Sequence, residues 1–204
     1  MRPPGLILAG GRSSRMGENK AQLQLGRDSI LGHVVRRLGP QVSELAINAA
    51  DPVPGLDTYT HVADSLDGQL GPLAGILTGM RHYLVHQPET SHFASAPCDS
   101  PFLPLDLVSR LTAACITAET IVIATSLERR HPVFGLWPVA LAEGLERWLL
   151  KGDNRRIGAF LDHHHLVTVD FQPLQTRYGS LDPFFNINTP EELAHASTFA
   201  EILA

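Results

Sequence analysis

Short apolar runs alternate with stretches of helical periodicity along this chain, and this alternation restricts the possible folds more than any other feature. The expected strands are residues 5–9, 45–49, 92–96, 120–125 and 133–137, and the expected helices are residues 30–38, 73–84, 105–117 and 139–150. Such alternation predicts a mainly parallel, Rossmann-like α/β sheet with helices on both faces. No internal repeat or linker interrupts the pattern, so we expect a single domain over residues 1–204.

The first expected strand runs into a glycine-rich, basic segment that ends at Lys20. Gly10 and Gly11 can turn backbone amides toward an anion without a side chain in the way, and Arg15 and Lys20 add positive charge. The spacing fits neither a Walker loop, in which lysine follows the last glycine, nor a dinucleotide fingerprint, which needs Gly-x-Gly. We therefore predict a phosphate-binding loop of another kind. The alternative is a glycine turn with solvated charges.

Composition and charge exclude several broad classes of protein. The net charge of -5 argues against a general nucleic-acid binder or a protein of anionic membrane surfaces, which would be basic. The apolar run at the N-terminus is too short for a signal peptide or a membrane span. The two cysteines, Cys98 and Cys115, lack the spacing of a metal-binding pair. These features predict a cytoplasmic protein with reduced thiols and a small, buried Cys98.

A lone acidic residue, Asp99, follows the third expected strand and stands between two prolines. Ligands of a parallel α/β sheet bind at the carboxyl ends of its strands, so Asp99 should share one rim with residues 10–20, 48–51 and 64–72. Magnesium takes one or two protein carboxylates together with water and phosphate oxygens. We therefore predict that Asp99 binds magnesium. The alternative is that Asp99 or Ser100 only caps a following helix.

Near the C-terminus, Thr189-Pro190-x-Glu192 predicts a helix start with a capping box. Asn186 and Asn188 precede it on an extended segment and therefore share one face. Their amide oxygens could join a metal site with Asp99 or hold a ligand. The alternative is that they hydrogen-bond the backbone of the turn.

Taken together, these segments resemble the nucleotidyltransferase superfamily, and within it the molybdenum cofactor guanylyltransferases. The resemblance spans nearly the whole chain and rests on five motifs in order: Leu8-Ala9-Gly10-Gly11-x-x-x-Arg15-Met16-Gly17-x-x-Lys20, Asp64-Ser65 with Gly71-Pro72-Leu73-Ala74-Gly75-Ile76, Pro97-Cys98-Asp99-Ser100-Pro101-Phe102, His131-Pro132-Val133-Phe134, and Asn186-Ile187-Asn188-Thr189-Pro190-Glu191-Glu192-Leu193.

The resemblance implies transfer of GMP from GTP to the phosphate of molybdenum-molybdopterin, with Mg2+ as cofactor and release of pyrophosphate. An accessory GTPase and apo-molybdoenzymes are the implied protein partners for handover of the product. The implied catalytic residues are Lys20, Asp99 and Arg15, with Asp99 as the metal ligand. The implied GTP-binding residues are Leu8, Ala9, Gly10, Gly11, Lys20, Asn48, Asp64 and Asp99, and the implied acceptor-binding residues are Asn186, Asn188 and His131.

One departure from the guanylyltransferase pattern bears on the choice of base. Asn19 and Ala21 flank Lys20 where aspartate and glycine are common, and this resembles the cytidylyltransferases of the same cofactor. Residues 8–11 and 71–75 match the guanylyl pattern instead, so we expect GTP. The alternatives are a cytidylyltransferase, a sugar-1-phosphate nucleotidylyltransferase, and an adaptor that binds a nucleotide without turnover.

Overall fold

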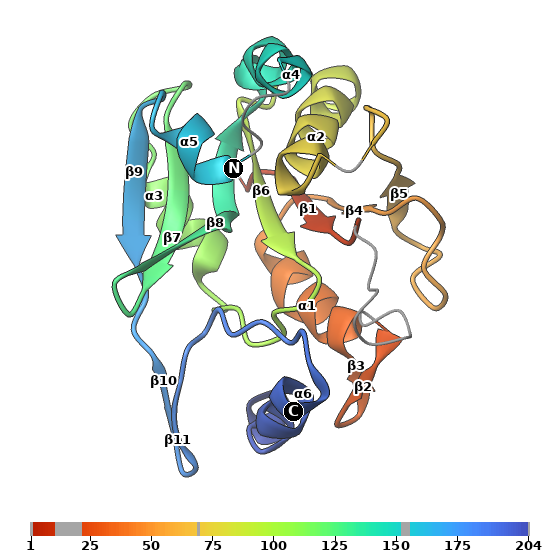
Figure 1. The fold of residues 1–204 in the computed structure, drawn as a ribbon, viewed down its shortest axis with the longest axis vertical. Helices are drawn as coiled ribbons and strands as arrows, with labels where there is room; N and C mark the ends of the chain where they lie inside the picture. The colour runs from red at the N-terminus through yellow and green to blue at the C-terminus, as the bar shows by residue number, and fades with distance from the viewer. Residues whose placement is uncertain (1, 11–21, 69, 152–155, 204) are drawn as a thin grey trace.

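A seven-stranded sheet in the order β5-β4-β1-β6-β8-β7-β9 runs through the centre of the protein (Figure 1). Its strands are β1 (Gly5–Leu8), β4 (Leu45–Asn48), β5 (Thr60–Val62), β6 (His92–Pro97), β7 (Ile121–Ser126), β8 (Arg129–Pro138) and β9 (Leu166–Asp170). Within this sheet β8 is antiparallel to β6 and β7, and the other neighbouring strands are parallel. This computed structural model describes residues 2–10, 22–68, 70–151 and 156–203.

Helices cover both faces of the sheet. They are α1 (Ile30–Leu38), α2 (Pro72–His86), α3 (Leu107–Ala114), α4 (Ala142–Leu150) and α5 (Ile157–Leu161). One apolar core joins α1 and α3 to Ile7 and Ile47 of the sheet, and a second joins α2, α4 and α5 to Leu6 and Trp137. The five expected strands and four expected helices are all present, which confirms the predicted mainly parallel α/β fold.

The first strand illustrates why this sequence forms a central parallel strand. Leu6, Ile7 and Leu8 are all buried, with Ile7 in one core and its two neighbours in the other. Side chains alternate between the faces of a strand, and a parallel sheet covered on both faces therefore needs a continuous apolar run. The apolar run at the start of the chain thus fits a strand in the middle of the sheet.

A smaller unit lies beyond the ends of the strands, at the bottom of Figure 1. It contains α6 (Pro190–Ser197), the short 3-10 helix η4 (Ala200–Leu203) and the hairpin of β2 (Gln24–Leu25) and β3 (Asp28–Ser29). A third apolar cluster holds these elements together, with Leu25, Phe102 and Phe199 among its buried members. The hairpin of β10 (Leu174–Thr176) and β11 (Gly179–Leu181) leads the chain from β9 into this unit.

The helix start predicted at Thr189 is confirmed. The backbone N–H of Glu192 donates to Thr189 Oγ1 over 3.2 Å, and the backbone N–H of Thr189 donates to Glu192 Oε2 over 3.0 Å. These reciprocal bonds are the capping box, and Pro190 occupies the first turn of α6. The segment before α6 therefore enters the helix in a defined direction.

Several features differ from the sequence-based expectation. The edge strands β5 and β9 are not among the expected strands, because β5 has only three residues and no residue of β9 is buried. The strand expected at 133–137 is the longer, antiparallel β8. The last expected helix begins with a 3-10 turn, η3 (Val139–Leu141), before α4. In the described part of the chain, no helix is long and apolar enough to cross a membrane.

Candidate functional site

The carboxyl ends of β1, β4 and β6 lie side by side at one edge of the sheet. Leu8 of β1 is in register with Asn48 of β4 on one side and with Pro97 of β6 on the other. The loops that follow these strands therefore start next to one another, and backbone bonds join Ala9 to Asn48 and Cys98 to Leu8. The described residues that directly follow β1, β4 and β6 therefore share one rim, as predicted.

Part of the predicted phosphate-binding loop lies outside the described residues. Gly11, Arg15 and Lys20 belong to that part, and their assignment stays a prediction. Of the described residues at its start, Leu8 is buried, Ala9 is half-buried and Gly10 is exposed on the rim. The described start of this segment, Ala9 and Gly10, therefore lies at the edge where the other candidate residues lie.

Asn48 and Asp64 form the side of the site next to β4. Asn48 is 2% exposed, and its Nδ2 donates to the carbonyl oxygen of Val62 (3.0 Å) and to Asp64 Oδ1 (2.9 Å). Both amide hydrogens are thereby used within the protein. The buried Asn48 side chain therefore holds the exposed Asp64 carboxylate in place.

The backbone at Gly75 and at Gly10 packs closely around the side-chain amide of Asn48. A methyl group added at Gly75 of α2 would lie 2.5 Å from Asn48 Oδ1 and 2.8 Å from Leu8 Cδ2, and one added at Gly10 would lie 3.4 Å from the same Oδ1. A separation of 2.5 Å is shorter than van der Waals contact, so Gly75 permits the approach of α2 to β1 and β4. This explains the glycine in the middle of the motif at residues 71–76.

Asp99 lies at the end of β6 and is 8% exposed. Its backbone carbonyl accepts from the N–H of Ile187 over 2.9 Å, and Ser100 Oγ hydrogen-bonds Asn186 Oδ1. The same hydroxyl lies 3.4 Å from Asp99 Oδ1. The fold thus brings Asp99 and Asn186 together, although 86 residues separate Ser100 from Asn186.

The alternative role of Asp99 or Ser100 as a helix cap is wrong. The next helix, α3, begins at Leu107, and its N-cap residue is Asp106. Residues 100–102 instead form a buried turn. Asn188 is half-buried, and its backbone N–H donates to Glu192 Oε2 over 2.6 Å.

The printed side-chain contacts at Asp99 bring together three oxygen groups of the described residues, namely the carboxylate of Asp99, the hydroxyl of Ser100 and the amide oxygen of Asn186. Within the described residues, no group of three or more His, Cys, Asp and Glu side chains could hold a metal ion by itself. Magnesium does not need such a cage, because it keeps several waters and shares phosphate oxygens with its substrate. The donor set therefore fits a magnesium ion that arrives with a nucleotide.

His131 lies in β8 and belongs to a polar cluster across the rim from Asn48. Its Nε2 is 2.7 Å from Ser126 Oγ, which donates to Asp182 Oδ1 over 2.7 Å. Because the single hydroxyl proton goes to the carboxylate, His131 donates to Ser126 through Nε2–H. The carboxylate also accepts from the backbone N–H of Phe184 over 2.9 Å, and so fixes the start of the segment that carries Asn186.

The surroundings of His131 favour its neutral form. Burial lowers the pKa of the imidazole, the Asp182 carboxylate opposes this shift, and Arg129 adds to it. The ring also packs on Phe184, with 4.7 Å between the ring centroids. Sequence reasoning had selected His131 but had missed Ser126 and Asp182, which lie 56 residues apart and carry no local signal.

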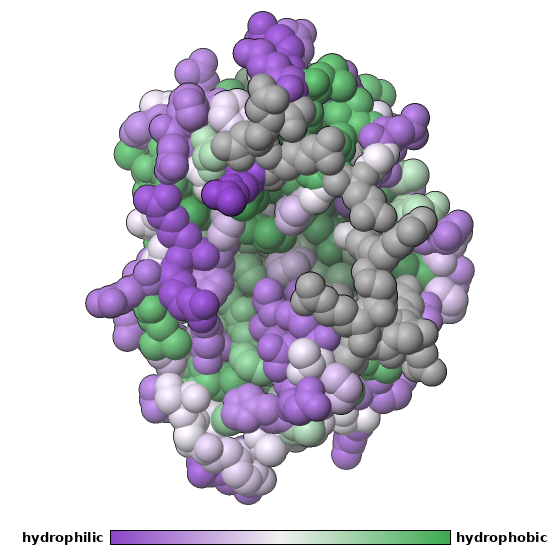
Figure 2. Space-filling model, in the orientation of Figure 1, coloured by the Kyte–Doolittle hydropathy of each residue, from purple (hydrophilic) through white to green (hydrophobic). Residues whose placement is uncertain are grey.

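In the space-filling view, apolar side chains lie in the middle of the face seen in Figure 1, and hydrophilic side chains border them on the left and below (Figure 2). A mainly parallel sheet covered by helices on both faces, with acidic and amide side chains at the carboxyl ends of its strands, places the chain in the class of doubly wound α/β proteins, which bind ligands at that edge.

Residues 5–167 match the model of the MobA-like NTP transferase domain. A molybdenum cofactor guanylyltransferase of Rhizobium rhizogenes is 48% identical over 201 residues, covering 98% of this chain and 93% of its own. The enzyme of the same name from Rhizobium meliloti is 48% identical over 206 residues, with the same coverage of both chains. The chain therefore belongs to the MobA-like NTP transferase family, and within it to the molybdenum cofactor guanylyltransferases.

Solved structures share the fold at lower sequence identity. Molybdopterin-guanine dinucleotide biosynthesis protein A from Archaeoglobus fulgidus is 20% identical and has a TM-score of 0.70, covering 97% of this chain and 98% of its own. A 4-diphosphocytidyl-2C-methyl-D-erythritol synthase from Anaerococcus prevotii is 14% identical and also has a TM-score of 0.70, covering 98% and 96%. These likenesses support the nucleotidyltransferase fold.

Proposed function

We propose that this protein transfers GMP from GTP to the phosphate of molybdenum-molybdopterin, forming the guanine dinucleotide form of the cofactor and pyrophosphate. The observation that carries the proposal is the 48% identity, over nearly the full length, to proteins named molybdenum cofactor guanylyltransferase. The same names favour GTP over CTP, despite Asn19 and Ala21. Among the five motifs, the rim residues Asp64, Asp99 and Asn186 belong to the described part of the chain.

The reaction needs orientation and charge neutralisation more than covalent catalysis. A phosphate oxygen of the acceptor attacks the α-phosphorus of GTP, a new P–O bond forms, and the bond from the α-phosphorus to the bridging oxygen breaks. The electron pair of that bond leaves with pyrophosphate. The attacking oxygen is already anionic at neutral pH, so the site must mainly align two polyanions and stabilise the leaving group.

Asp99 would hold Mg2+, which when bound supplies positive charge to the phosphates. Arg15 and Lys20 would bind the triphosphate and stabilise the departing pyrophosphate. Two features support this role because they restrict the movement of Asp99. They are the buried turn after β6 and the backbone bond from the Ile187 N–H to the Asp99 carbonyl.

The two sides of the rim would take the two substrates. The N-terminal half of the domain would bind GTP through residues 8–11, Asn48 and Asp64. The C-terminal half would bind the pterin acceptor through Asn186, Asn188 and His131. The backbone bond from Ile187 to Asp99 supports this division, because it places Asp99, the proposed metal ligand, where the two halves meet.

Further proposals concern partners and location. We propose that the product passes to an accessory GTPase or directly to apo-molybdoenzymes, and that the protein acts in the cytoplasm. Co-purification of the chain with an apo-molybdoenzyme, followed by transfer of labelled cofactor, would test the handover.

Calorimetric binding of GTP, CTP, ATP and UTP, each with Mg2+, tests the proposed function first. We expect selective binding of GTP, which Lys20→Ala weakens, followed by release of pyrophosphate when molybdenum-molybdopterin is added. A preference for CTP would contradict the guanylyl assignment. Tight GTP binding without turnover would contradict the enzymatic proposal and favour the adaptor.

A further inference from the structure

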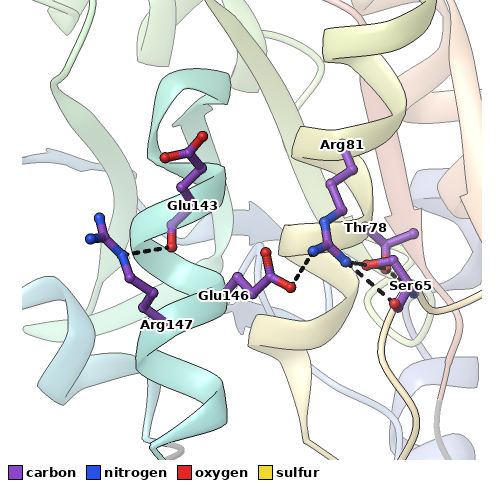
Figure 3. A network of polar contacts seen from close by, with 6 residues as sticks. All are labelled: Ser65, Thr78, Arg81, Glu143, Glu146 and Arg147. Carbon is purple, nitrogen blue, oxygen red and sulfur yellow. Dashed lines mark hydrogen bonds and ion pairs between the residues drawn. The ribbon is translucent and has the colours of Figure 1, made fainter.

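A polar network ties Ser65, in the loop after β5, to helices α2 and α4 (Figure 3). The backbone N–H of Ser65 donates to Thr78 Oγ1 over 2.9 Å. The Arg81 guanidinium donates to the carbonyl oxygen and the hydroxyl of Ser65 over 3.3 Å and 3.0 Å. A second nitrogen of Arg81 lies 2.5 Å from Glu146 Oε1 of α4. The backbone donor and acceptor of Ser65 are therefore both held by side chains of α2.

The hydroxyl of Thr78 is oriented for this contact. Thr78 is 2% exposed, and its Oγ1 donates to the carbonyl oxygen of Ala74 one turn earlier over 2.9 Å. The proton points along the helix, so a lone pair is available to the Ser65 N–H. A buried acceptor in a fixed direction determines where the Ser65 backbone can lie.

Arg81 fixes the same loop from its outer side. Its guanidinium is planar and presents several donors in a rigid arrangement, so it can contact Ser65 and Glu146 at the same time. The side chains of Arg81 and Glu146 are each 33% exposed, which makes this ion pair a weak contributor to folding. The apolar core between α2 and α4, with Leu77 and Leu145, already joins these helices.

We propose that Thr78 and Arg81 are positioning residues that act through Ser65 on the neighbouring Asp64, and thereby on GTP affinity. This inference rests on the proposed function, in which Asp64 holds the nucleoside. Asp64 is supported from two directions: Asn48 bonds its carboxylate, and the bonds of Ser65 to α2 restrict its backbone. Loss of the α2 contacts lets the carboxylate sample other directions and weakens nucleotide binding.

Two pairs of variants test this proposal, each with a matched control in the chain. Thr112 of α3 makes the same backbone contact one turn earlier, to Val108 over 2.7 Å, so Thr112→Val controls for Thr78→Val. Arg147 of α4 contacts the Glu143 carbonyl within its own helix, so Arg147→Ala controls for Arg81→Ala (Figure 3). The control residues lie on α3 and α4, away from the loop at Asp64.

We expect Thr78→Val and Arg81→Ala to raise the dissociation constant and KM for GTP roughly three- to tenfold, the effect of one lost hydrogen bond. The value of kcat and the affinity for the acceptor should stay within about twofold. Thermal melting should stay within a few degrees of the controls, with Thr78→Val slightly below Thr112→Val because Thr78 is buried and Thr112 is exposed. Arg81→Lys should lie between the wild type and Arg81→Ala, because lysine cannot contact Ser65 and Glu146 with the same geometry.

A double-mutant cycle separates positioning from general loosening of the fold. If Arg81 acts through Asp64, Arg81→Ala has little further effect on GTP affinity in an Asp64→Ala background. An undiminished effect there, or GTP binding by both variants that equals their controls, would overturn this inference while the wild type still bound GTP. Wild-type protein that bound no GTP would overturn the proposed function and this inference together.

Discussion

The side of the rim at β1 and β4 and the side at β7 and β8 are built in different ways. At β1 and β4, neighbouring strands and the close approach of α2 at Gly75 place Asn48 and Asp64. At β7 and β8, a single buried hydroxyl, Ser126, joins side chains that are far apart in the sequence. Close backbone packing leaves motifs in the sequence, whereas long-range side-chain contacts leave almost none.

The largest effect is expected at Asp99, where the two sides meet. Asp99→Ala should lower turnover on the order of a hundredfold, because it removes the carboxylate proposed to hold the metal ion beside the phosphates. Asp106→Ala is the matched control, since Asp106 makes no side-chain cap bond to α3. The rate of pyrophosphate release measures the turnover of both variants. Retention of more than about half of the activity by Asp99→Ala would contradict the proposed role.

Gly75→Ala tests the close packing at β1 and β4. The added methyl would meet Asn48 Oδ1 at 2.5 Å and Leu8 Cδ2 at 2.8 Å, so we expect the free energy of unfolding to fall by about 1–3 kcal/mol. GTP affinity should fall as well, because Asn48 must move. Urea unfolding and calorimetry measure the two effects.

Gly144→Ala in α4 is the matched control for this substitution. A methyl group at Gly144 meets no atom within 4 Å, so alanine should raise the free energy of unfolding by about 0.5–1 kcal/mol through helix propensity. Equal effects of the two substitutions would show that close packing at Gly75 is not what shapes this side of the rim.

Ser126→Ala tests the long-range cluster on the other side. Loss of the hydroxyl leaves Asp182 and His131 without their bridge, and we expect KM for the acceptor to rise roughly tenfold. The dissociation constant for GTP should stay unchanged. Ser109→Ala removes an exposed hydroxyl that contacts the Asp106 carbonyl and serves as the control. A rise in both the KM for the acceptor and the dissociation constant for GTP would contradict the distinction between the two sides of the rim.

The smallest expected effect is the pH dependence of stability at His131. The pKa of His131 is lowered in the folded protein, so the unfolded chain binds more protons just below its ordinary value of 6.5. The free energy of unfolding should therefore fall as the pH decreases through this window and be regained above it.

His131→Gln should remove this share of the pH dependence and reduce the slope. His82 and His92 also have lowered pKa values because of burial, so part of the slope should remain. Urea unfolding of the wild type and of His131→Gln between about pH 5 and pH 7.5 measures how the free energy of unfolding of each depends on pH. A slope that His131→Gln leaves unchanged would contradict the prediction.

Much of the site was predictable because its parts follow local patterns. The apolar run at Leu6–Leu8, the carboxylate after β6 and the capping box at Thr189 each depend on residues close in sequence. The place of Asn48 at the end of β4 follows from the local pattern, but its burial and its bonds to Val62 and Asp64 depend on how closely β4 and α2 pack.

Other parts could not be predicted from local patterns. The turn between β7 and β8 has Leu127 at φ 49° and Glu128 at φ 61°, without the glycine or asparagine that normally marks such a turn. This turn sends β8 back antiparallel and so places His131 two strands from β1. Its conformation depends on the pairing of the strands that it joins.

The sequence by itself determined the α/β order of elements, the rim at the strand ends and the start of α6, because hydrophobic periodicity and capping act over a few residues. Only the tertiary structure decided the direction of β8, the burial of Asn48, and the partners of Ser126 and Arg81. These depend on hydrogen bonds between segments that chain folding brings together, and hydrogen bonds of that kind have no periodic signature in the sequence.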